Sequence, residues 1–161
     1  MKTFFWVFAV YGFSLCLAGP TTDITITLRI EGHGPRPYVV VWVEDTKNTY
    51  IRTLQTWGTK AKYQRRLRNW NRVAEGVDGV SGATRPNGDY RLQWDGTDAQ
   101  GQPVQPGTYL VRAESVREDG PHCQIECEIK LDGSFSTAQG TPDEDIRSLS
   151  VTVKPSASER P

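Results

Sequence analysis

Histidine, cysteine and methionine are scarce in this sequence, which holds 2, 3 and 1 of them among 161 residues. The two histidines, His33 and His122, lie far apart, so they form neither a convincing metal site nor part of a Ser-His-Asp triad. A surface position or a hydrogen-bonded core position is the expectation for each. The sequence also lacks an HExxH motif, a P-loop and a GxGxxG motif. We therefore predict no catalytic residues and no metal ligands.

Neither sign of charge is in excess, because lysines plus arginines number 19 and aspartates plus glutamates also number 19. Proteins that bind nucleic acid usually carry a positive surplus, which attracts the phosphate backbone. We therefore predict no nucleic-acid partner and no general electrostatic attraction to a membrane surface.

No apolar run in the chain reaches the roughly 20 residues that cross a bilayer as a helix. The longest run, residues 4–17, falls short of that length and follows the positive charge of Lys2. Cys16, Leu17 and Ala18 then place small residues where a signal peptidase cleaves. This arrangement predicts a secretory signal peptide at residues 1–18 and a mature protein in the periplasm, outside the cytosol. An uncleaved membrane anchor is the alternative.

Removal of the signal peptide would leave Cys123 and Cys127 as the only thiols of the mature chain. An even pair of cysteines in an exported protein suggests a disulfide. On one straight strand, however, residues four apart lie about 13 Å from each other, so a disulfide needs a bulge or turn between them. Two ordinary thiols are the equal alternative. The absence of a CxxC motif speaks against a thiol redox protein.

Alternating and β-branched segments dominate the remaining chain and are typical of strands. Residues 22–31 alternate between apolar and polar positions, and residues 38–44 are a continuous valine-rich run. Similar patterns predict strands at 48–57, 89–95, 108–117, 122–131 and 149–153. We therefore predict an all-β chain, folded as an immunoglobulin-like antiparallel β-sandwich over residues 22–154. A disordered tail is predicted for residues 155–161.

One segment, residues 60–74, has the periodicity of a helix instead of a strand. Tyr63, Leu67 and Trp70 recur at the spacing of one helical face. The arginines between them face elsewhere and are expected to form a solvated basic surface. We therefore predict a single helix inserted into the sandwich.

A segment rich in glycine, aspartate and proline separates two predicted strands at residues 94–109. It resembles the hairpin of the immunoglobulin-like domain in flagellar hook-capping proteins. Trp94 and Tyr109 are placed to pack across the predicted strand pair. Asp95 and Asp98 are expected to build the turn, with calcium binding as the weaker alternative.

Residues 78–84 lie in a predicted glycine-rich loop and have the sequence Asp-Gly-Val-Ser-Gly-Ala-Thr. This segment resembles the acceptor motif of ApbE-type flavin transferases, Asp-x-x-Ser/Thr-Gly-Ala-Thr. The resemblance implies that FMN is attached by a phosphodiester to the hydroxyl of Thr84. It also implies four recognition residues, which are Asp78, Ser81, Gly82 and Ala83. Small residues also make up ordinary loops, so a plain loop is the alternative.

Most of residues 22–153 resembles a family of predicted periplasmic proteins known as domain of unknown function 2271. The segments that carry this resemblance are the strand ending Trp42-Val43-Glu44-Asp45, the Trp57-Gly58 pair, the loop at 78–86 and the segment at 94–109. The family implies an exported immunoglobulin-like domain found alongside flavin transferases and membrane redox proteins. A flavin transferase and a membrane redox protein are therefore the expected partners.

A flavin attached at Thr84 would need an aromatic surface and a positive charge nearby. The aromatic candidates close to Thr84 in sequence are Trp57, Tyr63, Trp70 and Tyr90, and a core position is the alternative for each. Arg85 is the adjacent cation, and Arg65 or Arg66 are further candidates for pairing with the phosphodiester.

These expectations combine into one prediction of function. We expect an exported flavoprotein with covalently attached FMN that acts in extracytosolic electron transfer. Such a protein would be a redox carrier rather than an enzyme with its own substrate. The alternative is a cofactor-free immunoglobulin-like binding or scaffold module of the periplasm.

Overall fold

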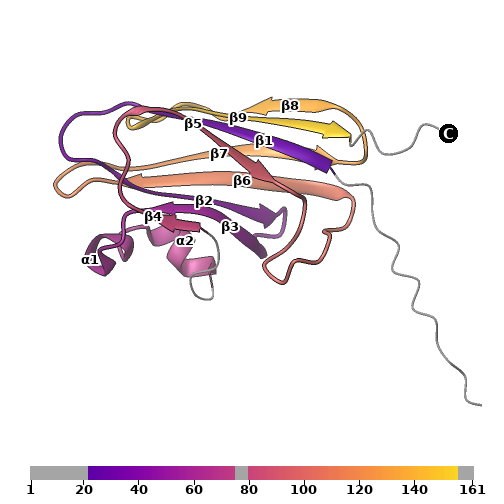
Figure 1. Cartoon of the computed structure of the whole chain (residues 1–161), viewed down its shortest axis with the longest axis horizontal. Coiled ribbons are helices and arrows are strands. Elements are labelled where there is room, and N and C mark those ends of the chain that lie inside the picture. The colour runs from indigo at the N-terminus through magenta and orange to yellow at the C-terminus, as the bar shows by residue number, and fades with distance from the viewer. Residues whose placement is uncertain (1–21, 75–79, 156–161) are drawn as a thin grey trace, which may run out of the picture.

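Two β-sheets packed face to face form the body of the protein (Figure 1). The computed structural model describes residues 22–74 and 80–155. The four-stranded sheet has the order β5 (Gly88–Trp94), β1 (Thr22–Ile30), β9 (Ile146–Pro155) and β8 (Ser136–Gln139). The five-stranded sheet has the order β4 (Val80–Gly82), β3 (Tyr50–Trp57), β2 (Tyr38–Asp45), β6 (Gly107–Val116) and β7 (His122–Leu131). All strand pairs are antiparallel except β3 with β4, so the predicted antiparallel β-sandwich is confirmed.

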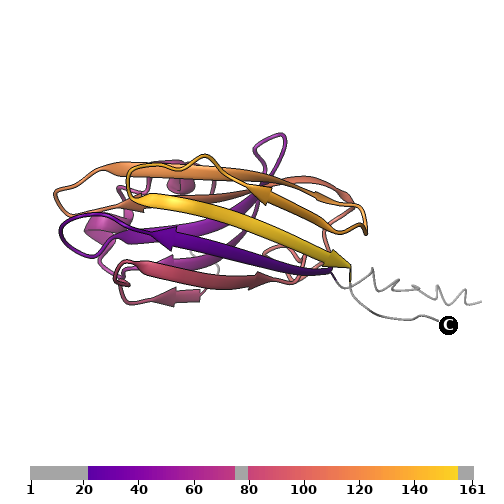
Figure 2. The same cartoon turned by 90° about the horizontal axis from the view of Figure 1, so that it is seen from above.

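The core between the sheets follows the alternation seen in the sequence. Ile24, Ile26 and Leu28 of β1 are fully buried and point toward the five-stranded sheet, while the residues between them are more exposed. Strand β9 beside it, visible in Figure 2, contributes inward side chains at every second position from Leu149 to Val153. A fully buried aliphatic side chain stabilises the fold by about 1.5–3 kcal/mol, so this alternation largely determines which face of each strand is inside.

Strand β2 is buried on both faces, which explains why its sequence is continuously apolar. Val39, Val41 and Val43 join the core between the sheets. Val40 and Trp42 face outward and form a second apolar cluster with Leu67 and Trp70 of the helical segment. The helices therefore cover the outer face of the five-stranded sheet, on the side away from the four-stranded sheet (Figure 1).

The predicted single helix at residues 60–74 is instead two short helices, α1 (Ala61–Gln64) and α2 (Arg68–Val73). The apolar face was predicted correctly, because Leu67 and Trp70 are 0 % and 3 % exposed. A long-range contact caps the start of α2. The carboxylate of Glu114 on β6 accepts hydrogen bonds from the backbone N–H groups of Asn69 (3.1 Å) and Trp70 (3.0 Å). In a continuous helix those N–H groups would bond to carbonyls of the preceding turn.

The predicted hairpin at residues 94–109 connects two different sheets instead of two paired strands. Its ends, Trp94 on β5 and Tyr109 on β6, still pack together, edge to face, with ring centroids 6.0 Å apart. They meet across the core, so the contact was predicted correctly but the strand pairing was not. Asp95 and Asp98 accept hydrogen bonds from backbone N–H groups two to four residues on, which confirms their role as turn residues.

Several predictions concern segments at or beyond the edges of the described chain. The predicted signal peptide at 1–18 lies outside the described residues, as do residues 156–161 of the predicted tail. Pro155, also assigned to that tail, is the last residue of β9. Within the described ranges, neither helix has the length and apolar character that a membrane crossing requires.

Cys123 and Cys127 both lie on β7, as free and buried thiols. The pairing of β7 with β6 runs without a register shift, so the bulge that a disulfide between them would need is absent from this described strand. Burial raises the pKa of the Cys127 thiol to about 11, and burial also raises the pKa of Cys123. The alternative of two ordinary thiols therefore describes this pair.

We expect both thiols to resist a disulfide-exchange reagent such as dithiodipyridine near neutral pH until the protein is unfolded, because the reactive thiolate is disfavoured by burial. The same burial should make the free energy of unfolding depend on pH. This free energy should fall as the pH rises from about 8.5, where an unfolded thiol ionises, toward the raised pKa of the folded thiol, because only the unfolded chain then loses the proton. Absorbance of the released thione measures the reaction. Rapid reaction of two thiols in the folded protein would contradict the buried placement.

Candidate functional site

The described part of the glycine-rich segment begins as an edge strand, which the sequence did not predict. Strand β4 lies parallel to β3, with Ser81 opposite Thr56 and Gly82 opposite Trp57. The backbone N–H of Gly58 extends this pairing by donating to the carbonyl of Gly82 at 2.8 Å. This ladder fixes the chain on the N-terminal side of Ala83 and Thr84.

A second set of contacts fixes the chain on the C-terminal side of Thr84. The hydroxyl of Tyr90 donates a hydrogen bond to the carbonyl of Pro86. The side chain of Asn87 donates to the carbonyl of Gly32 at 2.6 Å and accepts from a guanidinium nitrogen of Arg117 at 3.0 Å. Thr84 and Arg85 are therefore a short stretch held between two anchors.

The Arg117 guanidinium belongs to a buried ion pair beneath this stretch. Its Nε donates to Oδ2 of Asp145 at 2.7 Å, and the two side chains are only 1 % and 2 % exposed. The same guanidinium also donates to the carbonyl of Pro35. One arginine thus connects the segment before β2, the segment after Thr84 and the turn before β9. A buried charge is tolerated only with such full pairing.

A cleft of about 300 Å³ opens beside Thr84. It is lined by residues from four separate parts of the chain, namely Pro35, Arg36, Tyr38, Thr59, Lys60, Ala83, Thr84 and Glu118. Two of these residues are cations and one is a carboxylate. Lys60 Nζ lies 3.8 Å from Oε1 of Glu118, and the lysine side chain remains 71 % exposed. The cleft therefore has a positive balance among its lining residues.

Tyr38 forms the aromatic part of the cleft. Its ring packs at 4.9 Å from that of Tyr63 on α1, with the planes tilted by 36°. Its other neighbour is Gly58, where an added Cβ would lie 2.1 Å from Cδ1 of Tyr38. Burial raises the pKa of Tyr38, the charge of Lys60 opposes that shift, and Glu118 adds to it. The phenol is therefore within electrostatic range of two of the three charged groups of the cleft, Lys60 and Glu118.

The residues of the segment that resembles an acceptor motif fall at different places relative to this cleft. Ala83 and Thr84 line it, and Thr84 is half-buried. Ser81 is exposed on β4, and Gly82 is half-buried there. Asp78 lies outside the described residues. Arg85 is exposed and is not among the residues that line the cleft.

The predicted aromatic residues divide between the core and the neighbourhood of the cleft. Trp57 is 4 % exposed in the core and packs on Tyr90, with ring centroids 4.6 Å apart. Trp70 is also buried, and its indole N–H donates to the hydroxyl of Thr53 at 2.8 Å. The core alternative therefore describes both tryptophans. Only Tyr63 lies near the cleft, through its contact with Tyr38.

The sequence did not single out the cations that line the cleft. Arg66 donates to the backbone carbonyls of Arg117 and Glu118, at 2.7 and 2.6 Å, which fixes the segment carrying Glu118. Arg65 is exposed. Arg36 and Lys60 line the cleft instead. They come from the segments before β2 and before α1, outside the motif, and no local sequence pattern marks them as cleft residues.

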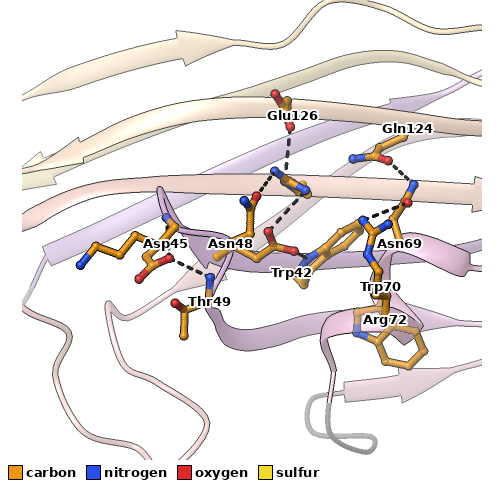
Figure 3. Close-up of polar contacts among 12 residues, drawn as sticks. Trp42, Asp45, Asn48, Thr49, Asn69, Trp70, Arg72, Gln124 and Glu126 are labelled. Carbon is orange, nitrogen blue, oxygen red and sulfur yellow. Dashed lines mark hydrogen bonds and ion pairs between the residues drawn. The ribbon is translucent and has the colours of Figure 1, made fainter.

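A second polar cluster lies on the outer face of the five-stranded sheet beside α2. Asn69 contacts Gln124 of β7 and Arg72, as Figure 3 shows. Nearby, the indole N–H of Trp42 donates to Glu44 at 2.6 Å, and Arg112 forms ion pairs with Glu44 and Glu126, both at 3.3 Å. The bond from Asn69 to Gln124 joins α2 to β7, and the other contacts join β2, β6 and β7 within the sheet.

The histidines have the roles expected from the sequence. His33 is exposed, and His122 lies against the buried carboxylate of Glu114. In residues 22–74 and 80–155, no group of three or more histidine, cysteine, aspartate or glutamate side chains has the arrangement of a metal site.

Comparison with known proteins gives one positive finding. The model of a family described as "predicted periplasmic protein (DUF2271)" matches residues 21–148. No curated protein and no solved structure matches the chain. The family description supports a periplasmic location.

Proposed function

We propose that this chain, which belongs to the DUF2271 family of predicted periplasmic proteins, carries FMN covalently on Thr84 and acts in extracytosolic electron transfer. The observation that carries the proposal is the coincidence of two independent features. Thr84 is the last residue of a segment that matches every defining position of the flavin-acceptor pattern it resembles, and it lines a cleft that is also lined by two cations and a tyrosine. A plain loop would need neither the match to the acceptor pattern nor the position of Thr84 in a cleft lined by cations.

The surroundings of Thr84 are compatible with modification by another enzyme. Ser81 and Ala83 are exposed, and β4 is the outermost strand of its sheet, so a transferase would meet an open edge. The anchors on both sides of Thr84 limit the conformations of the acceptor segment. A constrained acceptor loses less conformational entropy when it enters an active site.

The attachment chemistry needs only the hydroxyl of Thr84 from this chain. Thr84 Oγ1 would attack the phosphorus of FAD that bears the riboflavin portion, its proton would pass to a base, and AMP would leave. A flavin transferase would supply FAD and the groups that catalyse the transfer. Bound FMN supplies the electron-transfer chemistry, and the protein supplies position, shielding and electrostatics.

Export and a membrane partner complete the proposal. A secretory signal at residues 1–18 would deliver the chain to the periplasm, in agreement with the family description. A membrane redox protein would exchange electrons with the carrier there. The protein is accordingly proposed as a carrier without a substrate of its own.

Replacement of Thr84 by valine tests the attachment point, because valine keeps the shape of threonine and loses only the hydroxyl. We expect the wild-type protein, co-expressed with a flavin transferase, to retain flavin fluorescence after denaturation and removal of small molecules. Thr84→Val should retain none. Thr59→Val is the matched control, since Thr59 lines the same cleft, and it should retain flavin as the wild type does.

Equal flavin in the Thr84→Val and wild-type proteins would place the attachment elsewhere. Absence of flavin from all three proteins, with an active transferase present, would favour a cofactor-free binding or scaffold module.

A further inference from the structure

We propose that Arg36 and Lys60 form an anion subsite that binds the phosphoester of the flavin, while the ring lies largely outside the cleft. The inference rests on the proposed function, because it names the residues that hold the attached cofactor. It assigns a binding role to two residues that lie outside the acceptor motif.

The charge of the two cations is available to a ligand. Within the described residues, Arg36 forms no ion pair or hydrogen bond, and it is an exposed residue that lines the cleft. Lys60 has a single carboxylate partner among these residues, Glu118, at 3.8 Å, the long end of an ion-pair distance. Exposed pairs of this kind are weak, so a phosphoester can compete for the lysine.

The position of Thr84 places a phosphoester in the same cleft. Arg36 and Thr59–Lys60 line the cleft from the segments before β2 and before α1, while Thr84 lines it from the segment after β4. A phosphodiester formed on Thr84 Oγ1 begins one bond from that atom. Its negative charge therefore starts inside the cleft, where arginine and lysine are the side chains suited to bind it.

The size of the cleft argues for recognition of the phosphoester rather than the ring. Pockets that enclose a small molecule usually measure about 300–1,000 Å³. This cleft, at about 300 Å³, is at the lower limit and can cover only part of a flavin mononucleotide. The aromatic wall is also mostly covered, since Tyr38 is only 4 % exposed. A ring that remains accessible suits a carrier that must meet a redox partner.

Noncovalent binding of free flavins to the Thr84→Val protein tests this subsite without any covalent step. FMN and riboflavin differ only in the phosphate, and both can be titrated by their fluorescence at low ionic strength. We expect FMN to bind about tenfold more tightly than riboflavin, and inorganic phosphate to compete with FMN. Arg36→Gln and Lys60→Gln should each weaken FMN binding about threefold and leave riboflavin unchanged.

Two further variants make the test specific. Glu118→Gln removes the carboxylate that competes for Lys60, so FMN should bind more tightly to it than to the parent protein. Arg85→Gln removes an exposed cation next to Thr84 that does not line the cleft, and it should have no effect. Equal affinity for FMN and riboflavin, or a loss with Arg85→Gln and none with Arg36→Gln, would overturn the anion subsite.

This test separates the inference from the proposed function. If Thr84 proves never to be modified but FMN binds through Arg36 and Lys60, the covalent attachment fails and the anion subsite stands. If Thr84 is modified but the phosphate contributes nothing to binding, the subsite fails and the covalent attachment stands. Thermal unfolding of the Arg36, Lys60 and Arg85 variants should match that of the parent, because these residues are exposed.

Discussion

Arg117→Leu is expected to lower the free energy of unfolding by about 3–5 kcal/mol. The substitution leaves the carboxylate of Asp145 charged and unpaired at a position where its side chain is 2 % exposed. It also removes the hydrogen bonds from the guanidinium to the carbonyl of Pro35 and to Asn87. Urea unfolding followed by tryptophan fluorescence measures the change.

An exposed ion pair that involves Arg29 of β1 provides the control. Arg29 pairs with Glu31 at 3.4 Å, but both side chains are more than half exposed, at 52 % and 56 %. Arg29→Leu should therefore cost less than about 1 kcal/mol. The double variant Arg117→Leu/Asp145→Leu should recover part of the loss, because no buried charge is then left unpaired. Equal losses for Arg117→Leu and Arg29→Leu would contradict the buried pairing.

Gly58→Ala is expected to lower the free energy of unfolding by about 3 kcal/mol, from steric overlap and backbone strain together. The added Cβ would lie 2.1 Å from Cδ1 of Tyr38, and Gly58 has a φ of +106° that other residues rarely adopt. Tyr38 would have to move away from Gly58, and the cleft beside Thr84 would change shape. The same denaturation experiment, with FMN titration added, measures both effects.

Gly96→Ala separates the two causes of that loss. Gly96 also has a positive φ, +75°, but an added Cβ there meets no atom within 4 Å. Its cost should be about 1 kcal/mol, from backbone strain alone. FMN binding should be unaffected by Gly96→Ala and weakened by Gly58→Ala. A similar loss of stability in both variants would show that the contact between Gly58 and Tyr38 contributes little.

Features that depend on local periodicity could be predicted from the sequence. The alternation in β1 identified its buried face, and the continuous apolar run at residues 38–44 identified β2 as a strand. The spacing of Leu67 and Trp70 identified the apolar face of the helical segment. In each case the burial of apolar side chains makes the dominant contribution to the folding free energy. The spacing of these side chains is directly visible in the sequence.

Features that depend on contacts between distant segments could not be predicted. The start of α2 is capped by Glu114 of β6, and the segment after Thr84 is anchored through Asn87 to Arg117, which pairs with Asp145. Strand β4 has three residues and pairs through its backbone, so it leaves no side-chain pattern to recognise. The strands on either side of residues 94–109 belong to different sheets because β5 pairs with β1, whereas β6 pairs with β2 and β7.

The candidate site likewise combines a local feature, which the sequence reveals, with long-range features, which it does not reveal. The resemblance of residues 78–84 to a flavin-acceptor motif is local and therefore visible in the sequence. The cleft combines residues from four segments, and its cations became evident only once the chain was folded. The nearest cation in sequence, Arg85, lies outside the cleft, which shows that proximity along the chain is a weak guide to proximity in space.

The intact mass of the protein isolated from the periplasm of cells that contain a flavin transferase tests the central claim most directly. The account predicts a mass greater than that of the mature chain by one FMN minus water, with the added mass on the peptide that contains Thr84. An unmodified mass from cells in which the transferase modifies another acceptor protein would contradict it.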